Sequence, residues 1–308
     1  MKALALTGGV GGAKLALGLA QILSQTELTF LANTGDDFDH LGMHIAPDLD
    51  TLVYTLAGIS NRSAGWGRED ETWSFESTLE QLGGETWFKL GDRDLAVHVH
   101  RTYLMRQGAS LTEVTLLIAQ KFGVAHPILP MSDDPVRTVV NTREGLLSFQ
   151  RYFVEKQCKP TVLSLRYQGA DTAELNPELS LDDFSCVIIC PSNPYLSIDP
   201  MLAIGGLRDF LASTSIPVVA VTPLVKGAAL KGPTAKMMRE LGLESNAVTV
   251  AEHYKEVVSG FVLDQQDEGL LESVRSLGLE ATALQTVMST LDDRIALARQ
   301  VLDFCDSI

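Results

Sequence analysis

The order of the first elements restricts the fold of this chain more than any other feature. Residues 2–7 form a short apolar run, four glycines follow within residues 8–12, and residues 13–24 carry leucine and isoleucine at helical spacing. A second apolar run covers residues 27–33. A strand, a glycine turn, a helix and a second strand make the βαβ unit that begins a parallel sheet. We therefore expect an α/β fold with a doubly wound, mostly parallel, Rossmann-like sheet.

The rest of the 308 residues extends this pattern. Residues 52–125, approximately, show mainly helical spacing, so we expect a helical insertion within a single α/β domain that spans residues 1–308. A last helix is expected at residues 291–304. Further strands are expected at residues 136–141, 161–165, 186–190, 216–221, 248–250 and 261–263.

Charge and cysteine content exclude several classes of protein. With 24 basic and 39 acidic residues the formal net charge is −15, whereas proteins that bind nucleic acid or anionic membranes carry a surplus of lysine and arginine. No uninterrupted apolar stretch is long enough for a membrane span. The four cysteines form no CxxC pair, which favours structural thiols in a reducing compartment and a cytoplasmic location.

The glycine turn has the composition of a phosphate-binding loop. Glycine permits positive φ and close approach of a ligand to the backbone, and the helix that follows offers unpaired N–H groups. The candidate nucleotide-binding residues here are Gly8, Gly9, Gly11, Gly12 and Lys14. Lys14 stands where a dinucleotide fingerprint has its third glycine, and the P-loop sequence Gly-Lys-Ser/Thr is absent. A tight strand–helix turn without a ligand is the alternative.

A cluster of carboxylates follows the second expected strand. Residues 33–50 contain no lysine or arginine and five aspartates: Asp36, Asp37, Asp39, Asp48 and Asp50. Ligands of open α/β sheets lie at this edge, and carboxylate oxygens beside a phosphate suit Mg²⁺. The candidate Mg²⁺ ligands are Asp36, Asp37, Asp48 and Asp50. A solvated polar loop is the alternative, and zinc bound through His40 and His44 is disfavoured because no cysteine accompanies them.

Other polar segments are candidates for substrate contacts. Lys89 lies in residues 87–94, which combine aromatic, cationic and acidic side chains that suit either an anionic substrate or a solvated helix end. Ser192 and Asn193 follow the apolar run 186–190, so we expect them at the ligand edge of the sheet. Three lysines in a glycine-containing stretch are candidates to face a phosphate: Lys226, Lys231 and Lys236.

Taken together these segments resemble one known family. The residues that carry the resemblance are 8–14 (GGVGGAK), 33–37 (NTGDD), 46–51 (APDLDT), 88–94 (FKLGDRD), 130–134 (PMSDD), 147–150 (LSFQ) and 190–195 (CPSNPY). In this order they are similar to the 2-phospho-L-lactate transferase family of coenzyme F420 biosynthesis, over nearly the whole chain.

The resemblance implies a cytoplasmic, Mg²⁺-dependent transferase that forms a homodimer. Such an enzyme moves a phospho-lactyl, phosphoenolpyruvyl or phosphoglyceryl unit from a guanosine diphosphate-linked donor to a hydroxyl of the deazaflavin FO, and GMP leaves. By motif, Asp50 and Lys89 match FO-binding positions, and the glycine turn with Ser192 and Asn193 falls where the guanosine diphosphate part binds. Asp48 and Asp50 are the candidate catalytic acids; Asp50 either orients the acceptor hydroxyl, takes its proton or ligates the metal.

Two functions of other classes remain open on the same fold. One is an NAD(P)-dependent oxidoreductase, against which the incomplete dinucleotide fingerprint speaks, as does Asn33 at the position of the ribose-binding acid. The other is a non-catalytic nucleotide-binding module, which the clustered acids disfavour.

Overall fold

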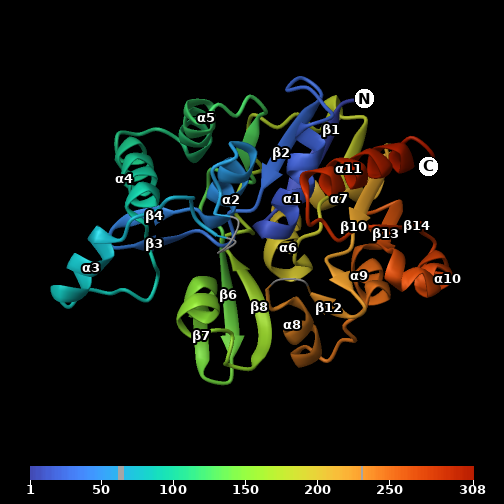
Figure 1. The fold of residues 1–308 in the computed structure, drawn as a ribbon. Helices are drawn as coiled ribbons and strands as arrows, with labels where there is room; N and C mark the ends of the chain where they lie inside the picture. The colour runs from blue at the N-terminus through green and yellow to red at the C-terminus, as the bar shows by residue number, and fades with distance from the viewer. Residues whose placement is uncertain (62–65, 230–231) are drawn as a thin grey trace.

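A seven-stranded parallel sheet forms the centre of the computed structural model, which describes residues 1–61, 66–229 and 232–308 (Figure 1). The strand order is β14-β13-β10-β9-β1-β2-β5, and every neighbouring pair is parallel. The sheet winds from β1 through β2 and β5 in one direction and through β9 in the other, which confirms the doubly wound α/β prediction. The strands are β1 (Ala3–Thr7), β2 (Leu28–Ala32), β5 (Ile128–Pro130), β9 (Cys186–Ile189), β10 (Val218–Val221), β13 (Gly260–Asp264) and β14 (Glu280–Leu284).

Helices cover both faces of this sheet. Side chains alternate along a strand, so Ala3 and Ala5 of β1 join one buried core and Leu4 and Leu6 join the other. The first core includes side chains of α1 (Gly9–Ala20), α2 (Pro47–Leu56), α5 (Leu111–Lys121) and α11 (Leu291–Cys305). The second includes side chains of α6 (Asp199–Leu202), α7 (Leu207–Ser213), α9 (Ala247–Tyr254) and α10 (Leu271–Arg275).

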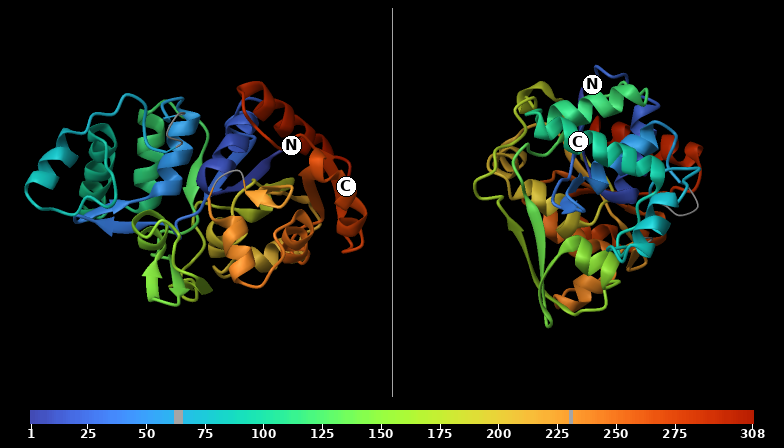
Figure 2. Two further views of the ribbon diagram at one scale, coloured as in Figure 1. Left: turned by 60° about the horizontal axis from the view of Figure 1, so that its bottom comes forward. Right: turned by 90° about the vertical axis from the view of Figure 1, so that its left-hand side faces the viewer.

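Two smaller parts extend from the carboxyl edge of the sheet. The helices α3 and α4 lie with the hairpin β3–β4 on the side away from the C-terminal half of the chain, and a three-stranded antiparallel sheet, β7-β6-β8, lies below them (Figures 1 and 2). Their bounds are β3 (Phe38–His40), β4 (Met43–Ile45), α3 (Ser74–Gln81), α4 (Asp92–Arg106), β6 (Arg137–Thr142), β7 (Gly145–Ser148) and β8 (Val162–Gln168). The assignment of residues 52–125 to an insertion within one domain stays a prediction.

The remaining elements are short. They are η1 (Arg151–Glu155), η2 (Leu181–Asp183), η3 (Pro194–Ile198), β11 (Leu224–Val225), β12 (Ala228–Ala229), α8 (Thr234–Glu240) and η4 (Gln265–Leu270).

The sequence-based elements were wrong at two places. The first helix begins at Gly9 rather than at residue 13, so the glycine turn is the first turn of α1, with Gly8 as its N-cap. Residues 248–250 are helical within α9 and not a strand, because the Asn246 side chain accepts a hydrogen bond from the backbone N–H of Thr249 and caps the helix.

Within the described residues no helix is both long and apolar enough to cross a membrane. The four cysteines are free thiols, and Cys186, Cys190 and Cys305 are buried in the core, as expected for structural thiols.

Candidate functional site

Polar groups from three strand ends meet where the sheet reverses its winding. The Ser192 hydroxyl, which follows β9, accepts a hydrogen bond from the Gly8 backbone N–H at 3.2 Å and donates one to the Gly8 carbonyl at 2.9 Å. Asp48, in the first turn of α2, accepts from the Gly9 N–H at 2.8 Å and from the Asn33 side-chain amide at 2.9 Å. The glycine turn, the end of β2 and the start of α2 are thereby held together.

The glycines are required by close packing of this turn. A Cβ on Gly11 would lie 2.4 Å from the carbonyl oxygen of Pro191, and one on Gly12 would lie 2.4 Å from the Thr7 hydroxyl. Gly9 has a φ of +63°, which favours glycine. The turn is therefore tight because α1 begins directly against the loops that follow β1 and β9. Its phosphate-binding role stays a prediction.

The side chains predicted beside this turn differ in their surroundings. Lys14 donates to the carbonyl of Met288, in the segment that precedes α11. Asn193 caps η3 through its side-chain oxygen, and its buried Nδ2 donor has no hydrogen-bond partner in the described chain. A ligand that accepts a hydrogen bond would satisfy that donor.

Asp36 and Asp37 carry carboxylate oxygens that the described residues leave without hydrogen bonds. Both residues are buried, and the Oδ1 atom of each has no partner. Burial, reinforced by the charges of Asp48 and Asp37, raises the pKa of Asp36 well above its usual range. Burial also raises the pKa of Asp37, although His44 Nε2 lies 3.2 Å from its Oδ2. Each carboxylate therefore offers an unpaired hard oxygen, the kind of ligand that Mg²⁺ takes.

Asp48 and Asp50 are already engaged by other groups. Both oxygens of Asp48 accept the hydrogen bonds described above, and burial raises its pKa to about 6. Asp50 forms a buried ion pair with Arg101 of α4, in which Arg101 Nη1 donates to Oδ2 at 3.1 Å and Nη2 contacts Oδ1. The roles of Asp36, Asp37, Asp48 and Asp50 as metal ligands, and of Asp48 and Asp50 as catalytic acids, stay predictions.

The ion pair continues into a buried network between α2 and α4. His98 Nδ1 lies 3.2 Å from Arg101 Nη1, and His98 Nε2 lies 3.4 Å from Asp94 Oδ2. The Tyr54 hydroxyl donates to Asp94 at 2.5 Å. One ligand atom each of Asp50, Asp94 and His98 lies within 4.8 Å of the others, as in a metal site. The Arg101 guanidinium already supplies positive charge there.

Sequence reasoning missed this network because Arg101 lies 51 residues from Asp50. The available signal is the spacing of Asp94, His98 and Arg101, which places them on one face of a helix.

Lys89 is exposed in the loop before α4. Ring contacts join this loop to the β3–β4 hairpin: Phe38 and Phe88 have ring centroids 4.8 Å apart, and His40 and Trp87 5.2 Å. Lys89 Nζ lies 3.9 Å from Glu76, so within the described residues no ion pair joins Lys89 to Asp50. Their shared role in binding FO stays a prediction.

The three lysines of the later glycine-containing stretch differ in what the structure shows of them. Lys236 Nζ pairs with Glu240 at 2.6 Å, and the backbone N–H of Lys226 donates to Asp267 at 2.8 Å. Lys231 lies outside the described residues.

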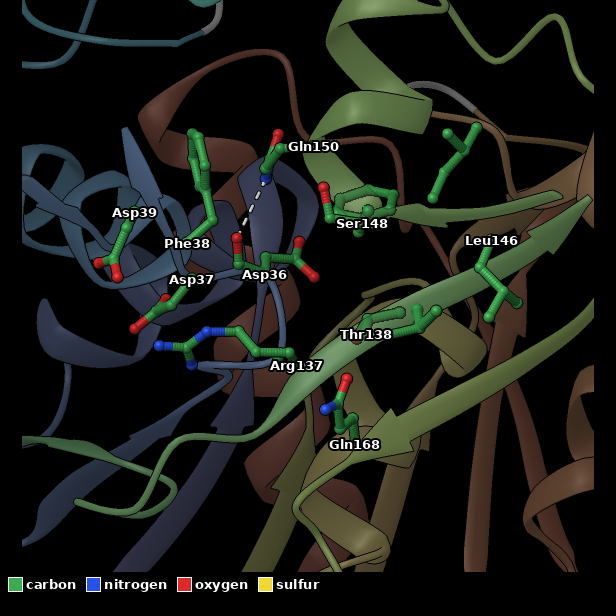
Figure 3. A pocket seen from close by; sticks show the side chains of 14 residues that line it. Asp36, Asp37, Phe38, Asp39, Arg137, Thr138, Leu146, Ser148, Gln150 and Gln168 are labelled. Carbon is green, nitrogen blue, oxygen red and sulfur yellow. Dashed lines mark hydrogen bonds between the residues drawn. The ribbon is translucent and has the colours of Figure 1, made fainter. Parts of the chain in front are cut away.

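A cavity of about 450 Å³ opens between the acidic segment and the antiparallel sheet (Figure 3). Asp36, Asp37 and Asp39 line one side, and the Gln150 side chain donates to the Asp36 carbonyl at 3.4 Å. Arg137 is the one basic residue in the described lining. The remaining lining residues are Gly35, Phe38, Thr138, Val139, Leu146, Leu147, Ser148, Phe149 and Gln168. Sequence reasoning did not identify this cavity, because it forms between segments about 100 residues apart.

Known proteins resemble this chain over its full length. A family model described as 2-phospho-L-lactate transferase CofD matches residues 4–296. A 2-phospho-L-lactate transferase of Methanosarcina acetivorans is 38% identical over 305 residues, covering 98% of this chain and 99% of that protein. A phosphoenolpyruvate transferase of Streptomyces griseus is 35% identical over 316 residues, covering 100% of this chain and 99% of that protein.

The fold also has a counterpart among solved structures. A protein of the UPF0052 family from Bacillus halodurans is 12% identical, covers 98% of each chain and superimposes with a TM-score of 0.62. At this identity the likeness concerns the fold alone.

Proposed function

The chain belongs to the 2-phospho-L-lactate transferase family, and from that premise we propose that it transfers a phospho-acid unit from a guanosine diphosphate-linked donor to the deazaflavin FO. The family makes the chain a transferase. The acceptor, the guanylated donor, the release of GMP and the Mg²⁺ requirement are parts of the proposal.

The proposed reaction is a displacement at the phosphorus that carries the three-carbon acid. The oxygen of the FO hydroxyl forms a bond to this phosphorus, the bond from phosphorus to the oxygen bridging to GMP breaks, and GMP leaves with that oxygen. A reaction of this kind needs positioning and neutralisation of charge rather than a protein nucleophile. The site suits this requirement, since it offers backbone N–H groups and carboxylates.

Asp36 and Asp37 would hold the Mg²⁺. When bound, Mg²⁺ would neutralise charge on the diphosphate and on the departing GMP. Two carboxylates match its usual demand, because Mg²⁺ in nucleotide sites takes one or two carboxylates and fills the remaining positions with substrate oxygens and water.

The other residues would bind the substrates and move the proton. The glycine turn and the Asn193 amide would bind the guanosine diphosphate part, while Asp50 and Lys89 would contact FO. Asp48 would accept the hydroxyl proton: burial raises its pKa to about 6, and each of its oxygens keeps a second lone pair beyond the hydrogen bond it accepts.

A single observation supports the proposal most strongly. Asp36 and Asp37 are buried with unpartnered oxygens and line a cavity. Burial of unpaired carboxylates is costly without a partner, and a cation that also contacts a diphosphate would remove that cost.

One incubation tests the reaction. The protein is mixed with FO, Mg²⁺ and the lactyl, enolpyruvyl or glyceryl form of the guanylated donor, and products are identified by mass spectrometry. We expect one FO adduct carrying the phospho-acid, with GMP in equal amount, and no product with EDTA. Formation of neither product with any donor would refute the proposal, and NADPH oxidation would instead support the oxidoreductase alternative. Light scattering tests the proposed homodimer.

A further inference from the structure

Arg137 is the one basic residue among the described residues that line the cavity beside Asp36 and Asp37. It begins β6, and its side chain extends toward Asp37, with Gln168 beside it on the neighbouring strand (Figure 3). Arg137 and Gln168 are opposite each other in the antiparallel register, so both side chains belong to the same face of the sheet.

The Arg137 guanidinium has few hydrogen-bond partners among the described residues. Within the described chain it donates one hydrogen bond, from Nη1 to the neighbouring Val136 carbonyl at 2.9 Å. It forms no ion pair within 4.0 Å among the described residues, although Asp37 lies on the same cavity wall. An arginine has five N–H donors in a planar fork, so most of its donors can bind a ligand.

We infer that Arg137 binds the carboxylate of the three-carbon acid that is transferred, an inference that rests on the proposed function. Lactyl, enolpyruvyl and glyceryl donors all have a carboxylate in their three-carbon unit. An arginine fork binds a carboxylate through two parallel hydrogen bonds. Inside a cavity with three aspartates, an anionic group is favoured only where a cation faces it.

Apolar residues of the cavity lining suit the third carbon of the three-carbon acid. Val139 and Leu146 lie on the same face of the sheet as Arg137, because strand residues two apart share a face and Leu146 pairs with Asn141. Their apolar side chains would contact the third carbon of the acid. The phosphorus would then lie on the side of the cavity formed by Asp36 and Asp37, where the proposed Mg²⁺ binds.

A comparison of two donors and three variants tests this inference. One guanylated donor carries the natural acid, and the other is an analogue in which the carboxylate is replaced by a methyl group. The variants are Arg137→Gln, Arg137→Lys and the control Arg143→Gln, at an exposed arginine in the turn between β6 and β7 outside the cavity lining. We measure kcat and KM for each donor, and KM for FO, in variants whose thermal unfolding matches that of the unchanged protein.

For the natural donor, Arg137→Gln should lower kcat/KM by about 10- to 100-fold, the value of losing hydrogen bonds to a charged group. The loss should appear mainly in KM for the donor. For the analogue, the same variant should change kcat/KM less than about threefold, because no carboxylate remains to bind. Arg137→Lys should lose less than Arg137→Gln with the natural donor, and Arg143→Gln should change neither donor.

Three results would overturn the inference. Equal losses of Arg137→Gln with both donors would mean that Arg137 acts on Asp37 or the phosphate, and no loss with either would remove its role. A rise in KM for FO alone would make the cavity an acceptor site. These outcomes require the unchanged protein to use the natural donor; absence of that turnover refutes the proposed function itself, and the inference with it.

Discussion

Replacing Arg101 tests whether the buried network holds α4 against α2. Arg101 is 2% exposed and its guanidinium pairs with Asp50, which is 5% exposed. Arg101→Met keeps most of the side-chain volume and leaves the Asp50 carboxylate buried without its counterion. Breaking a buried pair in this way costs about 3–5 kcal/mol of the free energy of unfolding. For a chain of 308 residues this corresponds to a melting temperature about 5–8 °C lower.

Calorimetry without added ligand measures this effect directly. A matched control is Arg275→Met, because Arg275 pairs with Glu272 at 2.7 Å and donates to the Ala281 carbonyl at 3.0 Å while its side chain is 47% exposed. A surface pair contributes about 0–1 kcal/mol, so the control should melt within about 2 °C of the unchanged protein. The double variant Asp50→Leu with Arg101→Met should regain at least about half of the loss, since apolar pairs replace buried ion pairs at little cost.

The reasoning fails if Arg101→Met melts as the Arg275→Met control does. It also fails if the double variant is less stable than either single variant, because the two side chains would then act independently. The result bears on Asp50 as a catalytic candidate. Asp50→Asn should lose well over tenfold in turnover, and this loss is assigned to FO binding or chemistry only at a temperature at which the variant is folded.

Three further perturbations have clear expected results. In a urea titration, Gly11→Ala should lower the free energy of unfolding by about 1–3 kcal/mol, because its Cβ would meet a backbone carbonyl at 2.4 Å. Gly205→Ala is the control, because a Cβ there would meet nothing within 4 Å, and it should change this free energy little. Mg²⁺ should raise the melting temperature of the unchanged protein but not that of Asp36→Asn, and an equal rise in both would exclude Asp36 as a ligand. Burial raises the pKa of the Cys190 thiol to about 12, so a thiol reagent at pH 8 should leave Cys190 unmodified in the folded protein and label it after unfolding. Half-buried Cys158 should be labelled first, and rapid labelling of Cys190 would contradict its burial.

Local patterns were sufficient to predict most strands of the central sheet. Buried parallel strands are continuous apolar runs, so β1, β2, β9 and β10 are visible in the sequence, and the glycines after β1 mark the turn into α1. The start of α1 was misplaced because glycines disfavour helices in isolation. Here the hydrogen bond from Gly9 to Asp48 and the packing against Pro191 hold the turn in helical form.

Elements that depend on distant partners were not predictable in this way. The strand β5 has three residues and β14 lies at the edge of the sheet, so neither shows a strong pattern of its own. The three-residue strands of the β3–β4 hairpin are polar at Asp39 and His40, and in the described part of the chain they pair with no other strand. The same limit applies to the site: residue types indicated Asp36 and Asp50 equally, and only the fold brings Arg101 to one of them and a cavity to the other.

If the proposed function holds, the different surroundings of these aspartates would allow an acidic site to accept a diphosphate. Four ionised carboxylates carry more negative charge than one divalent cation neutralises, so together they would repel an anionic donor. In the folded chain Arg101 balances Asp50, and two donors hold Asp48, so Asp36 and Asp37 alone keep unpartnered carboxylate oxygens among the acids of residues 33–50 that are buried. Two carboxylates balance the charge of one Mg²⁺ and leave its other positions for phosphate oxygens. Under the proposed function, losing Arg101 would leave the Asp50 charge without its counterion and should therefore weaken donor binding as well as stability.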